Sequence, residues 1–379
     1  MNESAFMSFD ILRILILFGG LQGFILGVIL ITTPRFQRKS NYFLAGLLFN
    51  LALLNFTSVA ELTLPRQEFP HLSYTPTFIV LTIPLFTFYF VKFLIEPHYE
   101  MKKKDLFLFL PAIWELCHRV IRYISFLISG PMAPADLHRF YFISNIYETI
   151  AVVSLLVIIV YSIKQLRAYE QNLYDNYAEV EGKSLSWLRM ILVSGVVLAT
   201  VWMIVTIADF KPEVFLIDLT LGLLLGLSIL IYWIGYTMII RQELLETPIF
   251  AISAKNSKNS ETSDLSAKTD DHYRRILEMM EEDQLFKDPN LNMSVLSQKT
   301  GLSNGYLSQI INSKREENFF DFVNSYRIKD VQLKMNDPTF NHYTILGIAQ
   351  EAGFKSKSTF NAVFKKSVGM TPSEYKKSL

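Results

Sequence analysis

Long apolar runs constrain the fold of this chain more than any other feature of its sequence. About 20 consecutive apolar residues are needed for a helix to cross the hydrocarbon core of a bilayer. Runs of about this length lie at 11–32, 42–60, 78–95, 106–128, 142–163, 188–207 and 214–240. The chain of 379 residues is 51% hydrophobic and has 30 Phe, well above the soluble average. We therefore predict a seven-helix transmembrane bundle over residues 1–243.

Basic residues in the loops predict the orientation of this bundle, because Lys and Arg resist translocation. They follow the odd-numbered runs: Arg35, Arg38 and Lys39; Lys102, Lys103 and Lys104; Lys164, Arg167 and Lys183; and Arg241. The first ten residues, MNESAFMSFD, contain no basic residue and lack the charged region of a signal peptide. The N-terminus is therefore predicted to lie outside the membrane and the C-terminus inside the cell.

The fourth run carries ionisable residues where lipid would penalise them. The sequence PAIWELCHRVIRY places Glu115, His118, Arg119 and Arg122 within it. If this run did not cross, either the Lys cluster at 102–104 or the C-terminal part would lie outside, against the charge bias. We retain it as a transmembrane helix on that argument.

Polar side chains within the predicted spans have two interpretations. Intramembrane ionisable residues usually face the bundle interior and often mark a functional site. They fall at mid-depth or in the outer half of the predicted bundle: Asn55, Glu115, Arg119, Arg122, Glu148 and Asp218. One interpretation is that Glu115 and Arg119, four residues apart on one helix, only neutralise each other. The other is a ligand pocket that opens outward.

The composition changes after residue 243. The stretch AISAKNSKNSETSDLSAKTD is rich in Ser, Asn and Lys and cannot bury enough apolar surface to fold, so residues 244–270 are predicted to be a flexible cytoplasmic linker. The single cysteine, Cys117, and six scattered His have no metal-ligand spacing. The sequence also lacks an HExxH motif. We expect no metal, no cofactor and no enzymatic activity.

Residues 271–379 show the short helical periods of a soluble all-helical domain. In MSVLSQKTGLSNGYLSQIINSKR, Gly301 is suited to a helix C-terminus, Ser303 can cap the next helix, and Leu307 begins its buried stripe. This pattern predicts a helix-turn-helix whose second helix is offered to a major groove. Its open face carries Asn304, Ser308, Gln309 and Asn312.

A second cassette repeats this design between residues 346 and 366. Gly353 marks the turn, Ser356 caps the second helix, and Phe360 and Phe364 form its buried face. Its exposed positions are Lys355, Lys357, Ser358, Asn361, Lys365 and Lys366. An amphipathic helix of about 20 residues joins the cassettes and spans roughly 30 Å, close to one turn of duplex at about 34 Å. One chain could therefore place two helices in successive major grooves.

The two cassettes and their connecting helix resemble the AraC/XylS family of bacterial transcription regulators over residues 271–379. The motifs that match in order and spacing are Ile348-Ala349, Gly353-Phe354, Phe360, Phe364-Lys365-Lys366, Gly369-Met370-Thr371-Pro372 and Tyr375. The connecting sequence FVNSYRI is also similar to the family pattern. The whole arrangement looks like a group in which seven membrane helices precede this domain, and LSWLR at 185–189 is similar to the start of its sixth span. The resemblance implies a multi-pass protein of the bacterial inner membrane.

The expected partners are double-stranded DNA, the lipid bilayer, a second copy in a homodimer and an unknown small-molecule or lipid signal. Amides pair with adenine and Lys with guanine edges, so Gln309, Asn312, Lys357 and Asn361 are predicted to read bases. Residues 271–379 hold 15 Lys and Arg against 13 Asp and Glu, and this modest excess predicts weak binding by one copy.

Three functions fit these features. The preferred hypothesis is a membrane-anchored regulator whose transmembrane helices sense a signal and alter DNA binding. In the second, the helices are a passive anchor and regulation comes from expression or proteolytic release. The third, a membrane enzyme or transporter with an attached DNA module, lacks the paired broken helices typical of transporters.

Overall fold

The computed structural model describes residues 3–64, 69, 71, 79–130, 134–180, 183–208, 214–240 and 265–379. Within these residues the regular elements are all helices, which confirms the prediction of an all-α chain with long apolar helices followed by a helical domain. The chain forms two compact units. The first comprises Met1–Leu166 and Leu185–Ala251, and the second comprises Arg167–Ser184 and Ile252–Leu379. The second unit is therefore built from two separate stretches of sequence.

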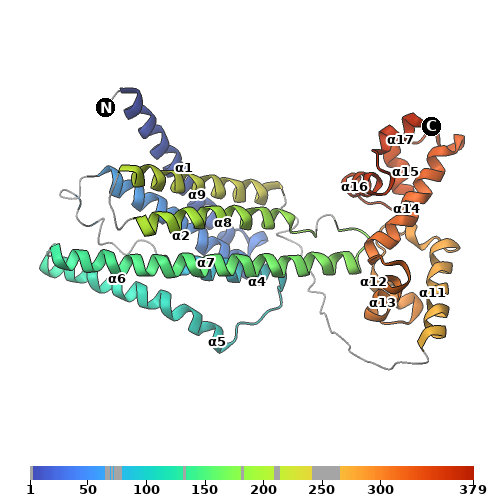
Figure 1. Cartoon of the computed structure of the whole chain (residues 1–379), viewed down its shortest axis with the longest axis horizontal. Coiled ribbons are helices and arrows are strands. Elements are labelled where there is room, and N and C mark those ends of the chain that lie inside the picture. The colour runs from blue at the N-terminus through green and yellow to red at the C-terminus, as the bar shows by residue number, and fades with distance from the viewer. Residues whose placement is uncertain are drawn as a thin grey trace. The chain divides into compact units, whose positions relative to one another are not determined.

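The first unit contains the long apolar helices seen in Figure 1. Its elements are α1 (Glu3–Thr32), η1 (Pro34–Phe36), α2 (Lys39–Thr63), α4 (Thr82–Ile95), α5 (Lys103–Leu106), η2 (Phe107–Phe109), α6 (Leu110–Ser129), α7 (Pro134–Asn176), α8 (Ser186–Ala208) and α9 (Val214–Ile240). Helix α7 continues beyond this unit, because its residues from Arg167 onward belong to the second one.

Helix α1 packs against both α2 and α9. Helix α2 also packs against α4, and α8 packs against α9. Helices α1 and α9 approach closely at Gly19 of α1, where a Cβ atom would lie 2.3 Å from the Cβ of Ser228 in α9. Only glycine allows the two backbones to come this near. Asn55 of α2 donates a hydrogen bond to the same Ser228 hydroxyl at 3.0 Å, so the three helices share one buried polar contact.

Five described helices are long and apolar enough to cross a membrane. They include Ile11–Thr32, Lys39–Thr63, Phe142–Asn176, Ser186–Ile207 and Asp218–Thr237. Helix α4 is apolar but has only 14 residues, and α6, with 20, is not among the five. Of the seven predicted spans, those at 78–95 and 106–128 are therefore the two that length and apolar composition of the described helices do not support by themselves.

The second unit contains the short helices of the C-terminal part (Figure 1). They are α11 (Leu265–Glu281), η3 (Leu285–Lys287), α12 (Met293–Thr300), α13 (Asn304–Arg315), α14 (Phe319–Asn336), η4 (Pro338–Phe340), α15 (Ile345–Glu351), α16 (Lys357–Val368) and α17 (Pro372–Ser378). Helix α11 begins six residues before the domain start predicted at 271, within the predicted linker. The rest of that linker, 244–264, lies outside the described residues.

Two hydrophobic cores organise the C-terminal helices, and α14 contributes to both. Phe319, Phe322 and Val323 of α14 are buried with residues of α11, α12 and α13. Ile328 and Val331, further along α14, are buried with residues of α15 and α16. Apolar residues on successive turns of one helix thus join two small cores, each of which contains one pair of short helices.

Candidate nucleic-acid interface

The first pair of short helices has the local geometry of a helix-turn-helix. The side chain of Asn292 caps α12 by accepting a hydrogen bond from the Val295 amide at 3.1 Å. Gly301 ends α12 with φ of 76°, a left-handed conformation that favours glycine. Ser303 then caps α13 by accepting from the Tyr306 amide. The turn between α12 and α13 therefore forms as predicted from the sequence, with Gly301 ending the first helix and Ser303 capping the second.

The second pair has the same construction. Thr344 caps α15 by accepting from the Gly347 amide at 3.0 Å, and Ser356 caps α16 by accepting from the Thr359 amide at 3.0 Å. Gly353 turns the chain between them with φ of 95°. Phe360 is buried on the inner face of α16. We call α13 and α16 the reading helices, since each is the second helix of its pair.

The predicted DNA-contact residues lie on the outer faces of the reading helices. On α13, Gln309 and Asn312 are exposed, and Asn304 and Ser308 are half-buried. On α16 and the residues before it, the exposed positions are Lys355, Lys357, Ser358, Asn361, Lys365 and Lys366. The amides and ammonium groups that could meet base edges or phosphates therefore point away from both cores.

Some of the basic side chains already have partners within the domain. The Lys366 ammonium lies 2.8 Å from the Asp321 carboxylate of α14. Lys355 donates to the Asn290 side chain at 2.6 Å, and Lys376 of α17 donates to the Met335 carbonyl at 2.8 Å. Lys366 and Lys376 therefore also tie their helices to α14, a structural role that the sequence did not reveal.

Arg327 of α14 is fully buried between the two cores, and it was not among the predicted site residues. Its guanidinium donates to the carbonyl of Phe286 at 2.8 Å and to that of Asp288 at 2.9 Å. It also lies over the Phe354 ring, 5.6 Å from the ring centroid. Burial lowers the pKa of Arg327 to about 10, while the nearby Glu179 and Asp288 carboxylates oppose this shift. One cation thus joins the two helix pairs.

Residues 177–179, which lie between α7 and α8 in sequence, contact this domain directly. Ala178 is fully buried in the first core. Tyr177 forms an isolated antiparallel bridge with Asn292, and the Asn324 side chain donates to the Ala178 carbonyl at 3.0 Å. The sequence predicted only that this connection, which carries Arg167 and Lys183, lies on the cytoplasmic side, because a single buried Ala leaves no recognisable pattern.

The polar residues predicted to form a pocket in the first unit occupy different places. Glu115 is fully buried and accepts hydrogen bonds from the backbone amides of Val80 and Leu81 at 3.2 and 3.0 Å. It also accepts from Arg119 at 2.8 Å. Glu115 therefore bonds to the Arg119 guanidinium of its own helix and to the two backbone amides that precede α4.

The remaining members lie elsewhere in the unit. Glu148 of α7 accepts from the Trp202 indole and the Thr206 hydroxyl of α8, both at 3.4 Å. Asn55 contacts Ser228, Arg122 is buried, and Asp218 is exposed. The structure thus brings Glu115 and Arg119 together but places Asn55 and Glu148 in separate contacts.

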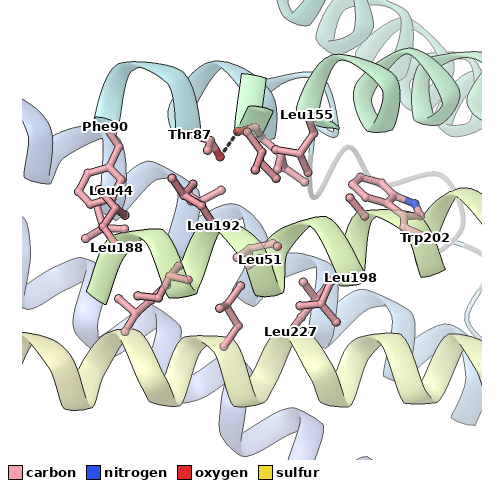
Figure 2. A pocket seen from close by; sticks show the side chains of 18 of the residues that line it. Leu44, Leu51, Thr87, Phe90, Leu155, Leu188, Leu192, Leu198, Trp202 and Leu227 are labelled. Carbon is pink, nitrogen blue, oxygen red and sulfur yellow. Dashed lines mark hydrogen bonds between the residues drawn. The ribbon is translucent and has the colours of Figure 1, made fainter. Parts of the chain in front are cut away.

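An apolar pocket in the first unit is lined by α2, α4, α7, α8 and α9 (Figure 2). The side chains around it include Leu51, Phe90, Leu155, Leu192 and Trp202. The hydroxyl of Thr87, also in the lining, donates to the Ile83 carbonyl at 2.9 Å and is therefore satisfied within its own helix. None of the six predicted polar residues lines this pocket. Its chemistry suits an apolar occupant.

Comparison with known proteins places the C-terminal helices in a recognised class. Residues 296–378 match the model of a helix-turn-helix domain. An uncharacterized HTH-type transcriptional regulator of Staphylococcus aureus (strain COL) is 31% identical over 114 residues, which are 30% of this chain and 14% of that protein. The regulatory protein SoxS of Escherichia coli (strain K12) is 27% identical over 89 residues, which are 24% of this chain and 80% of SoxS.

The family match lies in the C-terminal part, and the chain spans about a seventh of the length of the Staphylococcus relatives. No solved structure matches the chain. The matched residues 296–378 include the capped helices α13 and α16, so the family match and the observed helix pairs fall on the same part of the chain. The C-terminal part of this chain contains a helix-turn-helix domain of the AraC type, and the relatives it resembles are transcription regulators.

Proposed function

We propose that this protein is a membrane-anchored, sequence-specific transcription regulator whose transmembrane helices couple a signal to promoter binding. The observation that carries the proposal is the presence, in one chain, of long helices with apolar outer faces and of a paired helix-turn-helix domain. A homodimer on DNA and the inner membrane of a bacterium are parts of the same proposal. The DNA-binding domain then lies in the cytoplasm and the N-terminus outside.

Exposed apolar side chains on the first unit support a lipid environment. Phe18 of α1, Val197 of α8 and Ile229 of α9 are 56%, 61% and 58% exposed. A protein in water rarely leaves large contiguous apolar surfaces exposed, whereas a bilayer stabilises them. These helices are therefore suited to face acyl chains.

Helix α6 supports the fourth of the seven proposed spans, although charged residues lower its hydropathy. Trp114, Ile121 and Ile128 repeat at seven-residue spacing and are 69%, 65% and 79% exposed. Glu115 and Arg122, by contrast, are buried. An apolar outer stripe with charges turned inward is the arrangement expected of a polar membrane helix within a bundle. At 20 residues, α6 is also about 30 Å long.

The apolar pocket supports a lipophilic signal. Its lining comes from five helices, so an occupant that prefers one packing of those helices would shift their populations. An occupant that bound the active packing more tightly than the inactive one by about 5 to 6 kcal/mol would convert an almost entirely inactive population into an almost entirely active one. The polar group of Asn55, Glu115, Arg119, Arg122, Glu148 and Asp218 remains a proposal for a separate ligand contact.

Selection of DNA from a random duplex pool by the full chain in lipid vesicles tests the DNA-binding part of this function. Asn361 and Lys365 are both exposed on α16, one turn apart, and form a matched pair. Asn361→Ala should relax base preference at one position by about 1 to 3 kcal/mol. Lys365→Ala should weaken binding to all sequences and reduce the salt slope by about one. Equal effects of the two changes on base preference would contradict the assigned roles.

The passive-anchor alternative is distinguished by removing the first unit and joining residues 167–184 to 252–379, the two stretches that form the second unit. If the helices only anchor the domain, the remaining fragment should regulate the same promoters to the same extent in cells. Loss of the response to a signal that acts on the full chain supports sensing by the membrane helices.

A further inference from the structure

The surface of the DNA-binding domain is partly covered by residues 174–180, which we call the docked segment. These residues follow the membrane-type part of α7 in sequence and belong to the same compact unit as the domain. Ala178 is fully buried among core residues that include Leu296 and Phe322. A loop with a residue inside the core of a domain is part of that domain rather than a passive connection.

Contacts with α12 and α14 hold the docked segment to the first helix pair. Tyr177 pairs with Asn292, the residue that caps α12. Asn324 of α14, which is 1% exposed, donates to the Ala178 carbonyl at 3.0 Å. The Tyr174 and Phe320 rings form a T-shaped contact with centroids 5.2 Å apart.

A contact with α16 extends the docked segment to the second helix pair. The Thr359 hydroxyl donates to the Glu179 carboxylate. Thr359 is the third residue of this reading helix and is the residue whose amide the Ser356 cap binds. Its sequence neighbours Lys357, Ser358 and Asn361 are exposed candidates for DNA contact. Glu179 therefore places a negative charge within about one helical turn, ~5 Å along the axis, of the proposed interface.

The charge of this region opposes DNA. Residues 167–184 contain four acidic and two basic residues. Helix N-termini and basic groups near them attract phosphate, and a carboxylate placed there reduces that attraction. Lys183, which follows the docked segment within this stretch, is itself partly buried; this burial and the nearby Lys355 lower its pKa to about 8. Docking thus brings net negative charge to the edge of a weakly positive domain.

We propose that residues 174–180 act as a built-in inhibitory partner of the DNA-binding domain, and that their release is the step by which the membrane helices increase DNA binding. The segment is continuous with α7, which ends at Asn176, and α8 begins at Ser186 shortly after it. Both helices also contribute to the lining of the apolar pocket. An occupant that changes the spacing of α7 and α8 would pull on both ends of the connection. This inference rests on the proposed function.

A reversible covalent lock on the docked segment tests this inference in the full chain. Residues paired across an antiparallel bridge have Cα atoms about 4.5 to 5.5 Å apart, within the range that a disulfide spans. Tyr177→Cys with Asn292→Cys, in a Cys117→Ser background that removes the single natural cysteine, should form a disulfide on mild oxidation. The protein is kept in lipid vesicles, and retention of a random duplex pool is measured before and after reduction.

We expect retention of duplex to be at least threefold lower in the oxidised, locked protein and to recover on reduction. The two single-cysteine variants, treated identically, control for the loss of the Asn292 cap. Equal or stronger retention by the locked protein would overturn the inference, and so would failure of the pair to crosslink. If the reduced protein and the Cys117→Ser parent both fail to retain duplex, the proposed function itself is wrong.

A charge substitution gives an independent test without a crosslink. Glu179→Gln should increase retention of the random pool at low salt, and the increase should fade as salt rises, because screening removes the repulsion. Asp175→Asn is the matched control: it removes the same charge from the docked segment, but at a carboxylate that accepts from Gln171 of its own helix at 3.3 Å and not from Thr359. Equal effects of the two variants would show that overall charge, rather than the docked carboxylate, controls binding.

Discussion

At the scale of single residues, Arg327 is the clearest case of a side chain that holds the domain together. Burial of a guanidinium is costly unless its donors are satisfied, and here two backbone carbonyls and the Phe354 ring provide partners. Removing one partner of such a network leaves the other groups buried without a bond. The cost of losing Arg327 should therefore greatly exceed that of losing an exposed cation.

Arg327→Met should destabilise the C-terminal domain by about 3 kcal/mol, because the Phe286 and Asp288 carbonyls lose their donor. Amide hydrogen exchange of the full chain in detergent measures this as exchange roughly 150-fold faster in α14. Lys329→Met, at an exposed position of the same helix, is the control and should change little. Similar acceleration by both variants would show that Arg327 is not a structural centre.

At the scale of elements, the two helix-turn-helix turns differ in how tightly their glycines are enclosed. Both Gly301 and Gly353 have positive φ, at 76° and 95°. A Cβ at Gly353 would lie 2.6 Å from the Phe286 carbonyl oxygen, whereas one at Gly301 would have no neighbour within 4 Å. Glycine is therefore required at 301 only for its positive φ, whereas at 353 it is required both for its positive φ and for the close approach of the Phe286 carbonyl.

Gly301→Ala should cost only the left-handed backbone penalty, about 1 to 2 kcal/mol. Gly353→Ala should cost more, since the new methyl group also displaces the backbone near Phe286, against which Arg327 is bonded. Hydrogen exchange of α15 and α16 in the full chain should show the larger effect for Gly353. A larger effect for Gly301 would contradict the packing argument.

The elements also show which features could be predicted from the sequence. Turn glycines, Ser caps and apolar stripes act locally, so both helix pairs were predictable from residues such as Ser303 and Ser356. The five described helices that are long and apolar enough to cross a membrane were predictable for the same reason. The hydrogen bond to the Ala178 carbonyl and those from Arg327 to the Phe286 and Asp288 carbonyls join residues at least 39 positions apart, and no local pattern encodes such a contact. The predicted polar pocket and the base-reading roles remain predictions.

At the scale of the whole molecule, α7 and α8 connect the apolar pocket with the docked segment through continuous chain. Leu155 and Ile159 of α7 line the pocket, and the same helix ends next to Tyr177. Trp187 and Leu192 of α8, the helix that follows the docked segment in sequence, also line the pocket. Helices transmit displacement along their axes because their backbone bonds are mutually supporting. A change in the spacing of these helices is therefore a physical route for the proposed signal.

A bulky side chain at Gly195 of α8 tests this route. A Cβ there would lie 3.3 Å from the Ile159 side chain of α7, so Gly195→Leu should fill part of the pocket and separate the two helices. Gly222→Leu in α9 is the control, because its position is exposed and has no neighbour within 4 Å of a Cβ. Disulfide formation between cysteines at 177 and 292 should be at least threefold slower with Gly195→Leu and unchanged with Gly222→Leu. Equal rates in both would mean that the spacing of α7 and α8 does not govern docking, and the signal would then have to reach the DNA-binding domain through α9 and the stretch that follows it.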